Sequence, residues 1–226
     1  NFSKKIDVTA NLNFQHSFFK YNDFSTDIFI LNPSLFLNIK KTGFGNFSLS
    51  YSENNTLPEV NQLTSNFQLT DYRNFSQGTA YNKPLKNQTT TLNYYIYNDE
   101  KRFSINTSVY YVNSKSIFNT ISNLTNDFNF NSYIQTKGSN SYNFNFSFVN
   151  YVRKLKLASK IETNNSWITS PINVNSTEFL NAKSYSNSIK YSCTTYFKSK
   201  INFDFGFSYN YFQSNFQGIK TNNTTK

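Results

Sequence analysis

The chain of 226 residues is poor in the residues that most enzymes and metal sites use. It contains one cysteine, one histidine, one tryptophan and no methionine. A single cysteine excludes an internal disulfide and a zinc site made of several thiolates. One histidine excludes a histidine cluster, and no phosphate-loop, dinucleotide or nucleophile-elbow motif occurs. We therefore expect a protein that is not an enzyme and that uses no cofactor and no metal.

Long apolar runs are also missing. No stretch approaches the ~20 apolar residues of a membrane helix, and we see no signal peptide at the start. Yet the chain holds 25 Phe and 17 Tyr, although its mean hydropathy is −0.59. Disordered segments are poor in aromatic residues, so we expect a folded chain in which aromatic rings alternate with Asn, Ser and Thr.

The charge is basic but dispersed. Lys and Arg number 22 against 12 Asp and Glu, which gives a formal net charge of +10. No run of Lys and Arg exceeds two residues, and no helical pattern carries a basic stripe. We interpret these cations as scattered and solvated, and we expect no nucleic-acid partner.

The strongest periodic pattern is "INFDFGFSYNY", residues 201 to 211, where every second residue is apolar or aromatic. Successive side chains of a strand point to opposite faces, so this pattern predicts a strand with one apolar and one polar face. No segment shows sustained helical spacing, and the chain is therefore expected to be all-β. The predicted strands cover about residues 4–14, 26–40, 44–53, 89–98, 102–113, 139–150, 154–164, 184–197 and 200–212.

Proline marks one difficulty. Pro33 falls inside the segment 26–40, and proline cannot donate to a strand ladder. Either the strand starts at Ser34 or a bulge lies at Pro33. The other prolines, Pro58, Pro84 and Pro171, fall in expected loops, and "KTNNTTK" is expected to be a polar tail.

Connection lengths suggest a fold. Short connections ("KKTG", "NDEK", "VRK", "KS") alternate with long ones at about 15–25, 54–88, 114–138 and 165–183. In an antiparallel sheet all short turns then lie at one end, as in outer-membrane barrels, whose strands are also about this long. We predict a transmembrane, antiparallel, up-and-down β-barrel segment of about nine strands, an incomplete barrel. Residues 1–226 would be one barrel region, with a long extracellular loop at about 54–88.

A soluble β-sandwich or adhesin-like domain is the alternative, with the apolar face as its inner core. So many Phe and Tyr favour the barrel, because amphipathic rings gather at membrane interfaces. Trp167, at the long-loop end, suits such an aromatic girdle. Cys193 lies on the apolar face of its strand and is expected to act as a small hydrophobic residue.

Residues 28–98 resemble the barrel region of TonB-dependent outer-membrane receptors. In that family a strand ending P-S-L-x-L is followed by a strand ending in Tyr, by P-x-x-x-Q-L, and by G-N-P-x-L-K-P. The matching positions are Pro33, Ser34, Leu35 and Leu37, then Tyr51, Leu57, Pro58, Gln62 and Leu63, then Gly78, Asn82, Pro84, Leu85 and Lys86. The third element is spread out as "GTAYNKPLKN", and Asn87 replaces its usual second proline. The remaining chain agrees in rhythm alone.

The resemblance implies import of a siderophore, cobalamin, glycan or peptide fragment across the outer membrane of a Gram-negative bacterium. It also implies outer-membrane lipid around the barrel, a plug inside it, and an energy-coupling TonB partner acting through that plug. Nine strands are too few for this family and an odd number does not close an ordinary bacterial barrel. Because plug and partner box are absent, we expect an internal piece of a larger barrel.

Within the long loop, Tyr72, Arg73, Phe75 and Gln77 are the candidate ligand contacts, because binding residues concentrate on loops. Two other functions stay open. One is a structural or adhesive outer-membrane barrel that transports nothing, and the other is a soluble secreted β-sheet domain.

Overall fold

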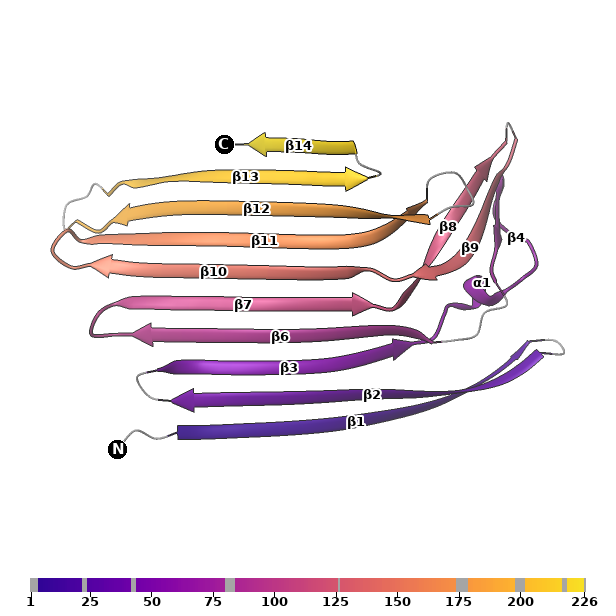
Figure 1. Cartoon of the computed structure of the whole chain (residues 1–226), viewed down its shortest axis with the longest axis horizontal. Coiled ribbons are helices and arrows are strands. Elements are labelled where there is room, and N and C mark those ends of the chain that lie inside the picture. Colours follow the sequence, from indigo (N-terminus) through magenta and orange to yellow (C-terminus); the bar gives the residue numbers. More distant parts are fainter. Residues whose placement is uncertain are drawn as a thin grey trace.

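In the computed structural model, the chain forms a ten-stranded sheet and a four-stranded sheet (Figure 1). The structure describes residues 4–21, 24–41, 44–79, 84–125, 127–173, 179–197, 202–216 and 219–225. The large sheet contains, in spatial order, β1 (Lys4–Tyr21), β2 (Phe24–Lys41), β3 (Gly45–Thr56), β6 (Leu85–Asn98), β7 (Phe103–Ser114), β10 (Asn140–Val152), β11 (Leu157–Asn173), β12 (Phe179–Thr195), β13 (Asp204–Phe216) and β14 (Ile219–Thr225).

All neighbours in the large sheet are antiparallel. The prediction of an all-β chain with antiparallel, up-and-down strand order is therefore confirmed. Strands β1 and β14 lie at the two ends of the order and do not pair with each other. The described part of the sheet is thus open, and no closed barrel is formed.

The strand ends separate only partly as the connection lengths predict, because β1–β2, β11–β12 and β13–β14 are joined by short connections at the end where long ones were expected. At one end, on the left of Figure 1, short connections link β2 to β3, β6 to β7, β10 to β11 and β12 to β13. The long connections after β3 and β7 leave from the opposite end. Those two connections fold into the second sheet, which contains β4 (Gln68–Asp71), β5 (Asn74–Gln77), β8 (Ser116–Leu124) and β9 (Asn129–Lys137), and a short helix α1 (Val60–Leu63).

Three predictions about strand extent are wrong. The expected loops at 15–25 and 165–183 belong largely to longer strands, since β1 pairs with β2 up to Tyr21 and Phe24, and β11 with β12 up to Asn173 and Phe179. The expected polar tail contains most of β14, so the large sheet has ten strands rather than nine. Backbone pairing supplies the stabilising contacts in these segments, and it needs no apolar alternation.

Proline positions also differ from expectation. Pro33 lies inside β2 opposite Leu12 with no register shift, so neither a strand start at Ser34 nor a bulge occurs. Pro171 lies inside β11 opposite Asn181 rather than in a loop. Each proline lies beyond the last pair with one neighbour, since β2 pairs with β3 only from Ser34 and β11 pairs with β10 only up to Thr169. On the side of that unpaired neighbour, the missing N–H of proline therefore costs no ladder hydrogen bond.

Very little of this molecule is buried. Among the described residues, the buried hydrophobic side chains are Ile28, Ile30, Ile121, Ala182 and Cys193. No second layer covers either face of the large sheet in the described part of the chain (Figure 1). The described helix is too short and too polar to cross a membrane.

Gly45 begins β3 with a φ of 83°, a conformation that favours glycine. A methyl group there would also press on the backbone carbonyl of Tyr95 on β6. We predict that Gly45→Ala lowers the free energy of unfolding by about 2 kcal/mol, measured by urea titration. The exposed neighbour provides the control: Asn46→Ala should change it by less than about 0.5 kcal/mol. Equal effects of the two substitutions would contradict the strain at Gly45.

Candidate functional site

The register of the large sheet sorts its side chains into two faces. Residues directly opposite each other on antiparallel strands share a face, so the pairs can be followed from strand to strand. One face, called here the apolar face, carries the alternating hydrophobic residues of the large-sheet strands β1, β2, β3, β6, β7, β10, β11, β12 and β13. Its members include Ile6, Val8, Leu35, Leu37, Phe47, Leu49, Leu92, Ile96, Ile105, Val109, Phe144, Phe146, Phe148, Ile161, Ile189, Tyr191, Phe205 and Phe207. The other face, called the polar face, carries mainly Asn, Ser and Thr.

Aromatic rings contact one another across strands on the apolar face. Towards the end with the long connections, the rings of Tyr111 and Tyr142 stack at 4.5 Å between centroids, and those of Trp167 and Tyr185 lie 5.2 Å apart. Towards the short turns, further ring contacts join Phe103 to Phe148 and Tyr191 to Phe205 and Phe207. Trp167 lies within β11, not after it, and is 44% exposed.

The second sheet is assembled from both long connections, and we call it the cap. Its strand order is β4-β5-β9-β8, and β5 pairs in parallel with β9. The hairpin of β4 and β5 comes from residues 54–88, whereas β8 and β9 extend from the ends of β7 and β10. Phe75 on β5 stacks on Phe130 of β9 at 5.3 Å and meets Phe128 edge-on at 5.6 Å. This aromatic contact holds the two connections together.

The four predicted ligand residues have different positions in the cap. Tyr72 lies in the turn between β4 and β5 and is 79% exposed, with the Arg73 guanidinium 5.3 Å from its ring. Phe75 packs inside the cap, and the Gln77 side chain donates to the backbone carbonyl of Ser65 at 2.7 Å. Tyr72 and Arg73 are therefore available to a ligand, whereas Phe75 and Gln77 stabilise the cap.

The two most exposed apolar residues on the strands of the cap were not predicted. Leu69 on β4 is 64% exposed and Leu124 at the end of β8 is 83% exposed. β4 has four residues, too few for an alternating pattern to identify it as a strand, so the exposure of Leu69 could not be predicted. Leu124 lies in a segment expected to be a loop. The two residues lie on the two edge strands of the cap, at opposite ends of its strand order.

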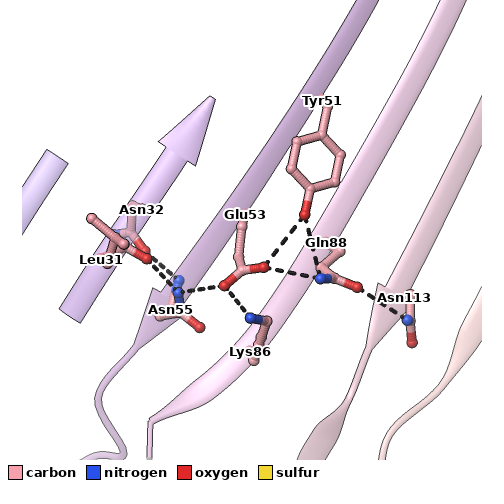
Figure 2. A network of polar contacts seen from close by, with 8 residues as sticks. All are labelled: Leu31, Asn32, Tyr51, Glu53, Asn55, Lys86, Gln88 and Asn113. Carbon is pink, nitrogen blue, oxygen red and sulfur yellow. Dashed lines mark hydrogen bonds and ion pairs between the residues drawn. The ribbon is translucent and has the colours of Figure 1, made fainter. Parts of the chain in front are cut away.

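A polar network lies where the long connection leaves the sheet, beyond the aromatic contacts of the apolar face (Figure 2). The Glu53 carboxylate on β3 forms an ion pair with Lys86 and accepts hydrogen bonds from Gln88 at 2.9 Å and Asn55 at 3.2 Å. Asn55 continues the network to β2, because its backbone N–H donates to the Asn32 side chain at 2.7 Å. Side chains from neighbouring strands thus converge on one carboxylate.

The pKa of Glu53 follows from this arrangement. Burial on its own would raise the pKa, but the hydrogen bonds from Lys86, Gln88 and Asn55 outweigh it and lower the pKa to about 2, from an ordinary 4.5. The carboxylate therefore stays charged at any physiological pH. Tyr51, one of the family-motif positions, donates to Glu53 at 3.4 Å and so belongs to the same network.

Most other family-motif residues shape the start of the long connection. Pro58 is buried, and the Gln62 side chain accepts from the backbone N–H of Glu59 at 3.0 Å. The Gly78 N–H donates to the Thr64 carbonyl at 2.6 Å, which ties the end of β5 to the segment after α1. Leu35 lies on the apolar face opposite Tyr51, Leu63 ends α1, and Pro84 and Leu85 lead into β6. Asn82 lies outside the described residues.

Across the described ranges, no three His, Cys, Asp or Glu side chains gather closely enough to hold a metal ion. No protein-family model matches the chain, and no curated protein matches it. The site is accordingly described from its own geometry: an uncovered apolar face, a polar face behind it, and a cap with Tyr72 and Arg73 at an exposed turn.

We predict that Glu53→Gln lowers the free energy of unfolding at pH 7 by about 1–3 kcal/mol, because charged hydrogen bonds are lost. The pKa of Glu53 is lower in the folded protein than in the unfolded chain. The stabilisation is therefore fully present above pH 4.5 and is lost as the pH falls through about 2. Urea titrations between pH 2 and 7 measure the difference. Glu100→Gln, at an exposed turn, is the control and should show no such pH dependence. A wild-type advantage that persists unchanged at pH 2 would contradict the assignment.

Proposed function

We propose that the chain is part of an outer-membrane β-barrel of the TonB-dependent-receptor type, in a Gram-negative bacterium, which imports a ligand across the outer membrane. Lipid contacts the apolar face, and the polar face lines an aqueous lumen. The cap lies on the extracellular side and captures the ligand. A plug outside this segment, coupled to an energised TonB partner, controls its passage.

The observation that carries this proposal is the uncovered apolar face. Phe205, Phe207 and Val8 are 57%, 61% and 64% exposed, and the register places all three on the apolar face. Burying one such side chain stabilises a protein by about 1.5–3 kcal/mol, so leaving the whole face in water would forfeit a large part of the folding free energy. A soluble β-sandwich solves this problem with a second sheet. Lipid solves it without one.

The dimensions of the face support the same environment. On β10 the apolar face extends from Tyr142 to Val152. The ten steps along the strand from Tyr142 to Val152 span ~34 Å, and a tilt of ~40° reduces this to ~26 Å across the membrane. The lipid-facing band of outer-membrane barrels is ~25 Å tall and is flanked by aromatic residues. The ring contacts of Tyr111, Tyr142, Trp167 and Tyr185 match such a girdle.

Ligand capture is assigned to the cap because it is built from the longest connections and presents Tyr72 and Arg73 outward. A ring with an adjacent guanidinium offers both an apolar surface and hydrogen-bond donors. An adhesive barrel without transport would use the same cap. Loss of uptake in a deletion strain supports import, whereas unchanged uptake with lost surface binding supports adhesion.

Adjacent residues on β7 test the membrane orientation. Val109 is on the apolar face and Ser108 on the polar face. We predict that Val109→Arg destabilises the protein by about 1–3 kcal/mol, because its partner Phe144 lies between the middle and one end of the apolar band, where a cation costs less than at the bilayer midplane, and that it reduces the folded, heat-modifiable form in outer-membrane fractions. Ser108→Arg, facing a watery lumen, should assemble nearly as well as the wild type.

Equal assembly of both arginine variants, or recovery of the wild-type protein from the aqueous fraction without detergent, would reject the barrel. The second result would instead support a secreted β-sheet domain.

A further inference from the structure

One row of the polar face has an unusual composition. It crosses nine strands, from β2 to β14, and each member lies directly opposite the next. We call it the amide row: Asn38, Ser48, Asn93, Ser108, Asn145, Asn164, Ser188, Asn210 and Thr225. From β2 to β14 this row contains only amides and hydroxyls, and it ends at the charged Asp7, which lies opposite Asn38 on β1.

Two hollows open along the amide row. The larger has a volume of about 270 Å³ and is lined by Asn and Ser residues of β10 to β14. The smaller, of about 170 Å³, lies towards β7. Asn145 and Asn164 line both hollows, which are therefore contiguous. Their single charged residue is Glu162, whose carboxylate is already paired with Lys160 at 2.7 Å.

Exposed aromatic rings accompany these amides. Phe212 lines the larger hollow and is 46% exposed. Tyr110, directly opposite Asn143 on the same face, is 39% exposed. Rings left in contact with water on an otherwise polar surface lose the stabilisation of burial. They are the kind of residue that a ligand with an apolar surface would cover.

We infer that the amide row binds a linear oligosaccharide of neutral sugars, an inference that rests on the proposed function and names the ligand class for the lumen. Each sugar hydroxyl both donates and accepts, and an Asn side chain offers two N–H donors and a carbonyl acceptor. The apolar C–H face of a pyranose ring packs on a flat aromatic ring such as Phe212. Contiguous hollows suit consecutive sugar units of a chain.

The amides of the row are also partly oriented in advance. The Asn145 side chain donates to the Ser108 hydroxyl at 3.2 Å, which uses one of its two N–H groups. The other N–H and the carbonyl oxygen remain for a ligand. Among the described residues, no Lys or Arg lines either hollow. An anionic ligand would therefore lose its hydration there without gaining an oppositely charged partner, which disfavours anionic ligands.

Calorimetric titration of the purified full-length protein in detergent tests the inference. The probes are neutral hexasaccharides derived from α-glucan, β-glucan, mannan and xylan, with hexagalacturonate as an anionic probe of equal length. We expect at least one neutral probe to bind, with little salt dependence, and at least 10-fold more tightly than hexagalacturonate. Asn145→Leu and Asn164→Leu should each weaken binding about 10-fold, whereas Asn11→Leu, exposed on the same face of β1, should not.

Each variant must keep the heat-modifiable mobility of the folded protein. If a leucine variant fails to fold, Asn145→Asp or Asn164→Asp replaces it, with the same expected loss. The inference is overturned if no neutral probe binds, if hexagalacturonate binds as tightly, or if the row substitutions have no effect. It is also overturned if a cysteine placed at Ser188, in a Cys193→Ser background, resists soluble thiol reagents, because another segment then covers the row. The arginine substitutions on β7 test the membrane orientation of the sheet, and their outcome does not depend on any of these binding results.

Discussion

The structure depends on one constraint: each strand of a single, uncovered sheet keeps most of its alternating apolar residues on the same side. The pairing register maintains this from β1 to β13, because a slip of one residue would move a strand's hydrophobic side chains to the polar face. With only Ile28, Ile30, Ile121, Ala182 and Cys193 as buried hydrophobic residues in the described chain, stability does not come from an interior core. It comes from backbone ladders, cross-strand side-chain contacts and, in our proposal, from the lipid that meets the apolar face.

The same register produces the features that we connect with function. Because direct neighbours share a face, Asn and Ser residues that are far apart in the sequence line up as the amide row, and Tyr and Trp residues line up as ring contacts behind it. The cap adds a second element at one end, where Phe75 and Phe130 hold two separate connections together. Below it, Glu53 ties β3 to β6 through Lys86 and Gln88. A ligand held at Tyr72 and Arg73 would thus start from a firmly attached cap and continue along the amide row, beside which Lys160, Glu162 and Lys190 lie on the same face.

Alternation in the sequence was enough to predict the all-β class, nine of the ten strands of the large sheet, and the long connections after β3 and β7. It failed where pairing needs no alternation: β14 is polar on both faces, and the outer parts of β1, β2, β11 and β12 carry mixed residues. The cap could not be predicted from the sequence, because the parallel pairing of Asn74 with Asn129 joins two distant segments in which no local sequence pattern indicates the pairing. The sequence predicted one group of ligand contacts in this loop: Tyr72, Arg73, Phe75 and Gln77. Only their packing in the folded cap shows that Tyr72 and Arg73 are exposed and that Phe75 and Gln77 stabilise the cap. The Glu53 network and the amide row exist only once the register is known.

The central claim is that lipid covers the apolar face, and the single tryptophan of the chain, Trp167, reports on it directly. Trp167 lies on that face of β11, half-exposed beside Tyr185. The decisive measurement is its fluorescence after reconstitution of the full-length protein into bilayers with and without phospholipids brominated on their acyl chains. The account predicts blue-shifted emission that the brominated lipids quench strongly and that aqueous iodide quenches weakly. Emission typical of water, quenched by iodide and unaffected by brominated lipid, would contradict it.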